Sequence, residues 1–163
     1  MAKITKIGYG QVEPNHLSAQ RTGQIYAQLP AADGIEVLEN GQFVKYDYAN
    51  GKVYFNGEGE FMLVFNEVKL YDVKETCKDF VMKKENCAGG VMVPRVFKTN
   101  VGDIYTTNMI DPDAEVAAGV KLAPGAEDGV LAVAEGNPDM IWKVIKVYTL
   151  ADGQAAVKLQ RIK

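Results

Sequence analysis

The only histidine of the chain, His16, stands two residues before the only serine, Ser18, and this pair has the residue types for nucleophilic catalysis. Side chains at i and i+2 of an extended chain point to the same side, so the two could touch. A catalytic serine also needs a group that orients its base and preformed donors for an oxyanion. The chain has no G-x-S-x-G turn to supply them. We therefore interpret the pair as a polar contact to a partner or to solvent.

Two carboxylate pairs have residue types suited to acid and base chemistry or to Ca²⁺ binding, Asp111 with Asp113 and Glu127 with Asp128. The first pair lacks the further oxygen ligands and the glycine spacing of a calcium loop. We interpret both pairs as solvated turns. The glycines form neither a G-x-G-x-x-G fingerprint nor a P-loop. We expect no catalytic residue, no metal and no cofactor, and hence no enzyme.

Two cysteines, Cys77 and Cys87, lie ten residues apart in a stretch rich in lysine and glutamate. Two cysteines are too few for a disulfide framework, and their spacing does not match a metal site. We therefore expect two free thiols.

One expected hairpin combines aromatic and basic side chains, as surfaces that bind single-stranded nucleic acid do. These side chains are Tyr46, Tyr48, Tyr54 and Phe55 with Lys45 and Lys52. The same rings serve equally well as cross-strand pairs or as core. The chain has a formal charge of −3 and a pI near 5.2, so it has no cationic surplus for a polyanion. We expect no nucleic acid partner.

Length and composition describe one ordinary folded domain, or one domain with an arm: 163 residues, 47% hydrophobic and 24% charged. The longest apolar runs, such as residues 61–65, are far shorter than the roughly 20 residues of a membrane helix. The N-terminus has two early lysines but no apolar stretch of signal-peptide length. We expect no membrane association and no Sec-type export.

The first thirty residues differ from the rest of the chain. Their apolar positions keep neither a period of 2 nor one of 3.6, and glycines and prolines interrupt them repeatedly. Such a segment buries too little apolar surface to repay its ordering entropy by itself. We therefore predict an extended N-terminal arm over residues 1–30 that lies on a neighbouring molecule. Residues 31–163 would form a single β-rich domain.

After Pro30, turn signals separate short segments rich in valine, isoleucine, phenylalanine and tyrosine, which is typical of antiparallel sheet. Segments 42–47 and 52–55 flank Asn50-Gly51 and form the best hairpin. Segment 61–70 is apolar on both faces in its first half, which predicts a central strand. The last long hairpin pairs segments 141–150 and 154–162.

Five further segments refine this picture. Residues 72–85 carry apolar side chains at helical spacing and would form the one short helix. Pro94 cannot donate to a strand ladder, so segment 91–98 belongs at an edge or bulge. Shorter strands are expected at 104–107, 120–122 and 130–134. The predicted fold is mainly β: an antiparallel β-barrel or sandwich with at most one short helix (about 72–85) and an extended N-terminal arm.

Several stretches of the sequence resemble stretches of known proteins. They lie at residues 12–16, 38–46, 60–71, 101–108 and 122–134. The first four resemble small head proteins of tailed bacteriophages. The fifth, with its order of glycine, apolar residue, turn, glycine and valine, is similar to capsid decoration proteins.

This resemblance implies a virion protein made in the host cytoplasm, a cement protein on the outer surface of the head. Its partner would be the major capsid protein, and its oligomer a homotrimer. The arm would lie across neighbouring capsid subunits, because a segment that folds on contact reaches several subunits at low protein mass. The residues that would make these contacts are Ile4, Ile7, Tyr9, Val12, Leu17, Arg21, Ile25, Tyr26 and Leu29.

Two other classes of protein remain open. The chain could be another virion component, such as a tail or head-completion protein with the same β-rich build. It could also be a small β-barrel module that binds a carbohydrate or another small ligand through its tyrosines.

Overall fold

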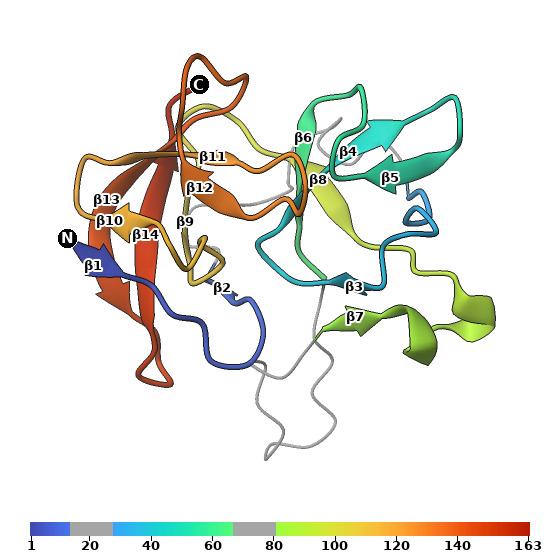
Figure 1. Cartoon of the computed structure of the whole chain (residues 1–163), viewed down its shortest axis with the longest axis horizontal. Helices are drawn as coiled ribbons and strands as arrows, with labels where there is room; N and C mark the ends of the chain where they lie inside the picture. Colours follow the sequence, from blue (N-terminus) through green and yellow to red (C-terminus); the bar gives the residue numbers. More distant parts are fainter. Residues whose placement is uncertain (14–27, 67–80) are drawn as a thin grey trace.

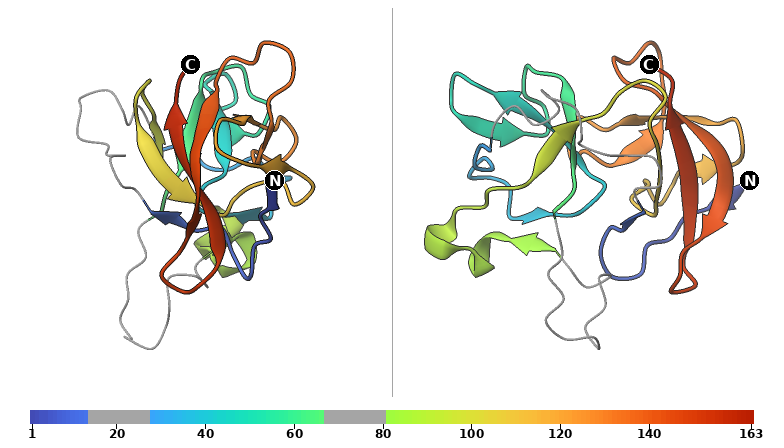
Figure 2. Two further views of the ribbon diagram at one scale, coloured as in Figure 1. Left: turned by 90° about the vertical axis from the view of Figure 1, so that its left-hand side faces the viewer. Right: turned by 180° about the vertical axis from the view of Figure 1, so that it is seen from behind.

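The computed structural model of the chain describes residues 1–13, 28–66 and 81–163. These residues form a mainly β structure with two large antiparallel sheets and two short two-stranded ones (Figure 1). The front and back views place the six-stranded sheet at one end of the long axis and the four-stranded sheet at the other (Figure 2). The predicted fold class, mainly β with antiparallel sheets, is confirmed.

The larger sheet has the spatial order β12-β11-β13-β14-β9-β2, and all of its neighbouring strands are antiparallel. Its members are β2 (Val12–Glu13), β9 (Ile104–Thr107), β11 (Lys121–Pro124), β12 (Leu131–Val133), β13 (Trp142–Thr149) and β14 (Ala155–Arg161). The last long hairpin of the sequence is β13 and β14, as predicted. Its register shifts between Val144 and Lys146, which marks a bulge in β13.

The smaller sheet has the spatial order β5-β4-β6-β8. Its members are β4 (Phe43–Asp47), β5 (Lys52–Tyr54), β6 (Phe61–Val64) and β8 (Val96–Lys98). The predicted hairpin is β4 with β5, and Gly51 has the positive φ of 63° that its turn requires. Strand β6 lies inside the sheet and β8 at its edge, so the expectations for a central strand and for an edge strand near Pro94 both hold.

Two short pairs complete the described strands. Strand β1 (Ala2–Lys3) pairs with β10 (Glu115–Val116), and β3 (Val37–Leu38) pairs with β7 (Met82–Lys83). Two 3₁₀ turns follow β7, η2 (Lys84–Asn86) and η3 (Ala88–Gly90). Residues 72–80 of the predicted helix at 72–85 lie outside the described residues. Its last positions, from Met82 onward, form β7 and the start of η2 instead of a helix.

The four-stranded sheet is buried on both faces, because neighbouring residues of its strands enter two different cores. Phe43 enters the first core and Val44 the second; Leu63 and Val64 of the adjacent strand divide in the same way. The first core fills the space between the two sheets and includes Trp142 and other side chains of the six-stranded sheet. The second lies against β3 and the segment before it. The small sheet therefore packs against a core on each of its faces.

Candidate interaction surface

The structure places the first predicted contact residue, Ile4, inside the molecule. Its side chain is fully buried in the first core, with Val116 and Trp142 among the members of the same cluster. Its neighbours Ala2 and Lys3 form β1 against β10. The prediction that Ile4 contacts a neighbouring subunit is therefore wrong. The physical reason is that two-residue strands leave no periodic signal, yet still carry an apolar side chain into the core.

The other described contact residues differ in exposure. Ile7 is 69% exposed, whereas Tyr9 and Leu29 are half-buried, Leu29 against the second core. Val12 belongs to β2, the edge strand of the six-stranded sheet, and packs against the first core. The ammonium group of Lys83 lies 5.6 Å from the centre of the Tyr9 ring, and hydrogen bonding with Tyr9 raises the pKa of Lys83.

The remaining predicted contact residues lie outside the described residues. They are Leu17, Arg21, Ile25 and Tyr26, and the same holds for His16, Ser18 and Cys77. Cys87 is described and carries a free thiol, whose sulfur lies 3.2 Å from the carbonyl oxygen of Lys83.

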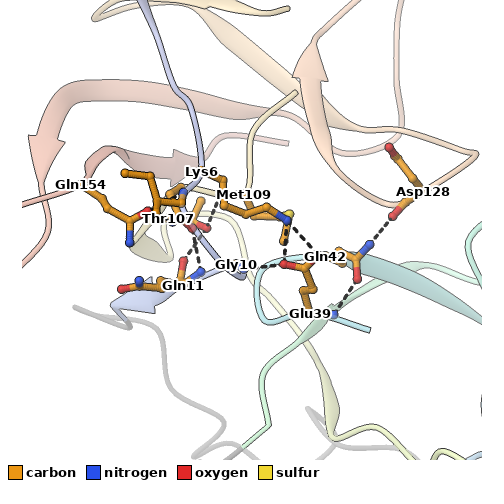
Figure 3. Close-up of polar contacts among 11 residues, drawn as sticks. Lys6, Gly10, Gln11, Glu39, Gln42, Thr107, Met109, Asp128 and Gln154 are labelled. Carbon is orange, nitrogen blue, oxygen red and sulfur yellow. Dashed lines mark hydrogen bonds and ion pairs between the residues drawn. The ribbon is translucent and has the colours of Figure 1, made fainter. Parts of the chain in front are cut away.

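A partly buried carboxylate holds the N-terminal segment, residues 1–13, against the domain. Glu39 accepts two hydrogen bonds from the ammonium group of Lys6, at 2.8 and 2.7 Å, and one at 2.5 Å from the backbone N–H of Gly10 (Figure 3). The Glu39 side chain is only 15% exposed. Charge-assisted bonds of this kind are stronger than neutral ones. Glu39 is thus a latch between this segment and the loop before β4.

Further hydrogen bonds attach the same segment to the six-stranded sheet. The N–H of Gln11 donates to the side-chain oxygen of Asn108 at 2.7 Å, and the hydroxyl of Thr107 donates to the carbonyl oxygen of Gln11 at 2.7 Å (Figure 3). The N–H of Ile7 donates to Gln154 Oε1 at 2.8 Å. The N-terminal segment is therefore bonded both to the loop before β4 and to the six-stranded sheet.

Gln42 extends the latch to the β11–β12 turn. Its Oε1 accepts from the N–H of Glu39 at 2.7 Å, and its Nε2 donates to the carbonyl oxygen of Asp128 at 2.9 Å (Figure 3). Sequence reasoning missed Lys6, Glu39 and Gln42, because their residue types fit a solvated loop and their partners are distant in sequence. The only local signal was the run of polar residues before β4.

Two grooves lie beside this network. One has a volume of about 420 Å³ and is lined by Ile35, Tyr54, Phe55, Asn56 and Glu127, among others. The other, of about 400 Å³, is lined by Lys6, Met109, Ile110, Asp111 and Asp128.

The carboxylates that line the second groove accept hydrogen bonds from the backbone of their own turns. Asp111 Oδ1 accepts from the N–H of Asp113 at 2.9 Å, and Asp128 Oδ1 accepts from the N–H of Val130 at 2.9 Å. These local bonds are those of Asx turns, in which the side chain bonds to its own backbone two residues on.

Within residues 1–13, 28–66 and 81–163, no three side chains of histidine, cysteine, aspartate or glutamate gather closely enough to share a metal ion. The same residues contain no helix with the length and apolar character to cross a membrane. Protein-family models, curated protein sequences and solved structures give no significant match to the chain.

Proposed function

We propose that the chain is a structural protein of a tailed-bacteriophage virion, a capsid decoration protein that binds the outer surface of the major capsid lattice and stabilises the head. In this role it carries out no reaction and acts as a homotrimer on the capsid surface. The sequence phrases that resemble head proteins support this proposal, as does the β-rich fold.

The observation that carries the proposal is how residues 1–13 and 28–30 attach to the domain. Residues 1–13 are latched to the domain and end in β2, the edge strand of the larger sheet. Beyond residue 27, Leu29 packs against the second core, and the carbonyl oxygen of Pro30 accepts from the N–H of Val53 in β5. The described residues on both sides of 14–27 are thus attached to the domain. A contact segment held in this way loses less entropy on binding than a free tail does.

A repeated lattice makes such contacts effective even when each is weak. Once one contact of a subunit or trimer is made, the others form at high effective concentration. A protein that binds the assembled shell but not its free subunits also stabilises that shell by mass action.

Cosedimentation with DNA-free capsid shells of the phage that encodes the chain tests the proposal. We expect the wild-type protein to pellet with the shells, and electron microscopy to show it on the shell faces. Density only at the portal vertex or on the tail would favour the other virion role. A wild-type protein that stays in the supernatant contradicts the proposal.

The contact segment can be tested with a variant that carries Leu17→Ser, Arg21→Glu, Ile25→Ser and Tyr26→Ser. We expect this variant to lose shell binding while its thermal unfolding transition stays unchanged. A truncation of residues 1–30 is unsuitable as a test, because it would remove Ile4 from the core.

A second candidate function, a ligand-binding module, is favoured by the groove that Tyr54, Phe55, Asn56 and Glu127 line. Aromatic faces beside amide and carboxylate groups suit a sugar, whose rings have apolar faces and polar edges. A glycan array tests this function. Specific binding that Tyr54→Ala abolishes would support it, and a blank array would contradict it.

A further inference from the structure

Four lysines share the outer face of the six-stranded sheet. Lys121 of β11 stands opposite Lys143 of β13, and Lys146 of β13 stands opposite Lys158 of β14. Cross-strand partners have their Cβ atoms about 4.5 to 5.5 Å apart, and successive residues on one face follow at about 7 Å. The four ammonium groups therefore form one compact cationic patch. We call Lys121, Lys143, Lys146 and Lys158 the lysine face.

The strand register shows on which side of the six-stranded sheet these lysines lie. Val144 and Leu159 are a cross-strand pair, and both are buried in the first core. Lys143 and Lys158 are their chain neighbours, so they point away from that core. Lys121, Lys143 and Lys146 are exposed, and Lys158 is half-buried.

The charges of the lysine face are not compensated within the described part of the chain, where none of the four lysines forms an ion pair. Lys146 has one contact of a different kind, with its ammonium group 5.1 Å from the centre of the Tyr148 ring. Like charges directly opposite each other destabilise a sheet. Two such lysine pairs lie in adjacent strands, although the chain as a whole has a formal charge of −3. These pairs do not stabilise the fold.

An apolar and an aromatic side chain lie beside these lysines. The bulge in β13 leaves Ile145 40% exposed between Lys143 and Lys146. The half-buried ring of Tyr148 follows two residues further along β13. Apolar and aromatic groups within a charged rim are typical of protein–protein interfaces.

We propose that the lysine face is a docking surface for an acidic protein surface, namely exposed aspartate and glutamate side chains of the major capsid subunit. This inference rests on the proposed function and names the chemistry of its partner. A protein fits better than nucleic acid, because Ile145 and Tyr148 need an apolar counterpart that a phosphate backbone lacks.

Charge reversal separates binding from stability in a single variant. Lys143→Glu with Lys158→Glu places a carboxylate opposite Lys121 and another opposite Lys146. Both repulsive pairs then become attractive, so we expect an unfolding temperature equal to or above that of the wild type. We expect shell binding in 150 mM salt to weaken by about tenfold or more, because both new carboxylates face the acidic surface.

The matched control is Lys45→Glu with Lys84→Glu, which changes the net charge equally but on other elements. We expect this control to bind shells as the wild type does. If the wild type binds shells and the lysine-face variant binds equally well, the inference fails and the proposed function stands. If the wild type itself fails to bind shells, the proposed function fails.

A probe that needs no capsid tests the surface separately. An oligoglutamate peptide, titrated into the ¹⁵N-labelled protein at low salt, should shift the amide signals of β11, β13 and β14, and the shifts should vanish in the lysine-face variant. Absence of shifts on these strands overturns the inference. Tighter binding of a DNA duplex to the same strands also overturns it, because the partner would then be a nucleic acid.

Discussion

Gly129 lies directly against the backbone of Phe43. The N–H of Phe43 donates to the carbonyl oxygen of Gly129 at 2.8 Å, and a Cβ atom at position 129 would overlap the carbonyl oxygen of Phe43. Phe43 starts β4, and Gly129 lies in the turn between β11 and β12, so this contact joins the two sheets at their backbones. The φ of Gly129 is +69°, in the region that favours glycine.

Gly129→Ala should lower the free energy of unfolding by about 3 kcal/mol or more, because it adds a steric overlap to the cost of a left-handed backbone. The control is Gly136→Ala, with a φ of +61° and no atom within 4 Å of its Cβ position. Only the backbone cost applies there, about 1 to 2 kcal/mol. Urea unfolding of both variants measures the difference. Equal losses would show that the sheets are not in contact at Phe43.

A second prediction concerns Arg161, which connects the same two sheets through its side chain. Its guanidinium donates to the carbonyl and hydroxyl oxygens of Thr99 and, at 3.2 Å, to Glu60, although the residue is only 8% exposed. Arg161→Met leaves the Thr99 carbonyl without this donor. We expect a loss of about 3 kcal/mol in the free energy of unfolding, measured by denaturant titration.

Glu60→Gln is the comparison variant for Arg161. The Glu60 side chain is 36% exposed, and Lys98 also binds it at 2.8 Å. An exposed ion pair contributes about 1 kcal/mol or less, so we expect a much smaller loss from this change. A loss as large as that of Arg161→Met would mean that the ion pair, rather than the bonds to Thr99, gives Arg161 its effect.

These long-range contacts mark the limit of what the sequence predicts. The two main hairpins were predicted because alternation and turn residues such as Asn50-Gly51 act within a few residues. Ile4, Glu39 and Gln42 were not, because their roles depend on partners far along the chain. Lys6, for instance, bonds to Glu39 across 33 positions. No local period encodes such a pairing. The N-terminal segment has no periodic apolar pattern, which is why the sequence predicts an arm there, although the first part of this segment belongs to the core.

A third prediction tests the Glu39 latch. Glu39→Gln keeps the shape of the side chain but removes the charge that binds Lys6 and the N–H of Gly10. We expect the amides of Gly10 and Gln11 to exchange with deuterium at least about tenfold faster, since the segment opens more often. Glu36→Gln is the control, because Glu36 pairs with Lys84 at an exposed position. Unchanged exchange at Gly10 would show that the bonds from Ile7 and Gln11 suffice to hold the segment.

The last prediction concerns Tyr105, whose hydroxyl is fully buried in the first core and has no hydrogen-bond partner among the described residues. Its ring lies beside that of Trp142, at a centroid distance of 4.8 Å. Burial raises the pKa of Tyr105 well above its usual value of 10.0, because the tyrosinate anion would lose its hydration. As the pH rises past 10, this tyrosine ionises in the unfolded chain but stays protonated in the fold. The unfolded state then binds fewer protons, so the stability of the fold decreases.

Tyr105→Phe removes this titration. Near neutral pH we expect the variant to be as stable as the wild type or up to about 1 kcal/mol more stable, because the lost hydroxyl had no partner. Above pH 10 the advantage of the variant should grow by about 1.4 kcal/mol per pH unit, as one proton separates the two states. Urea unfolding between pH 7 and pH 11 measures this difference, in which the titration of all other groups cancels. A Tyr105→Phe curve that stays parallel to the wild type would show that this tyrosine ionises equally in both states, and therefore that its hydroxyl reaches water.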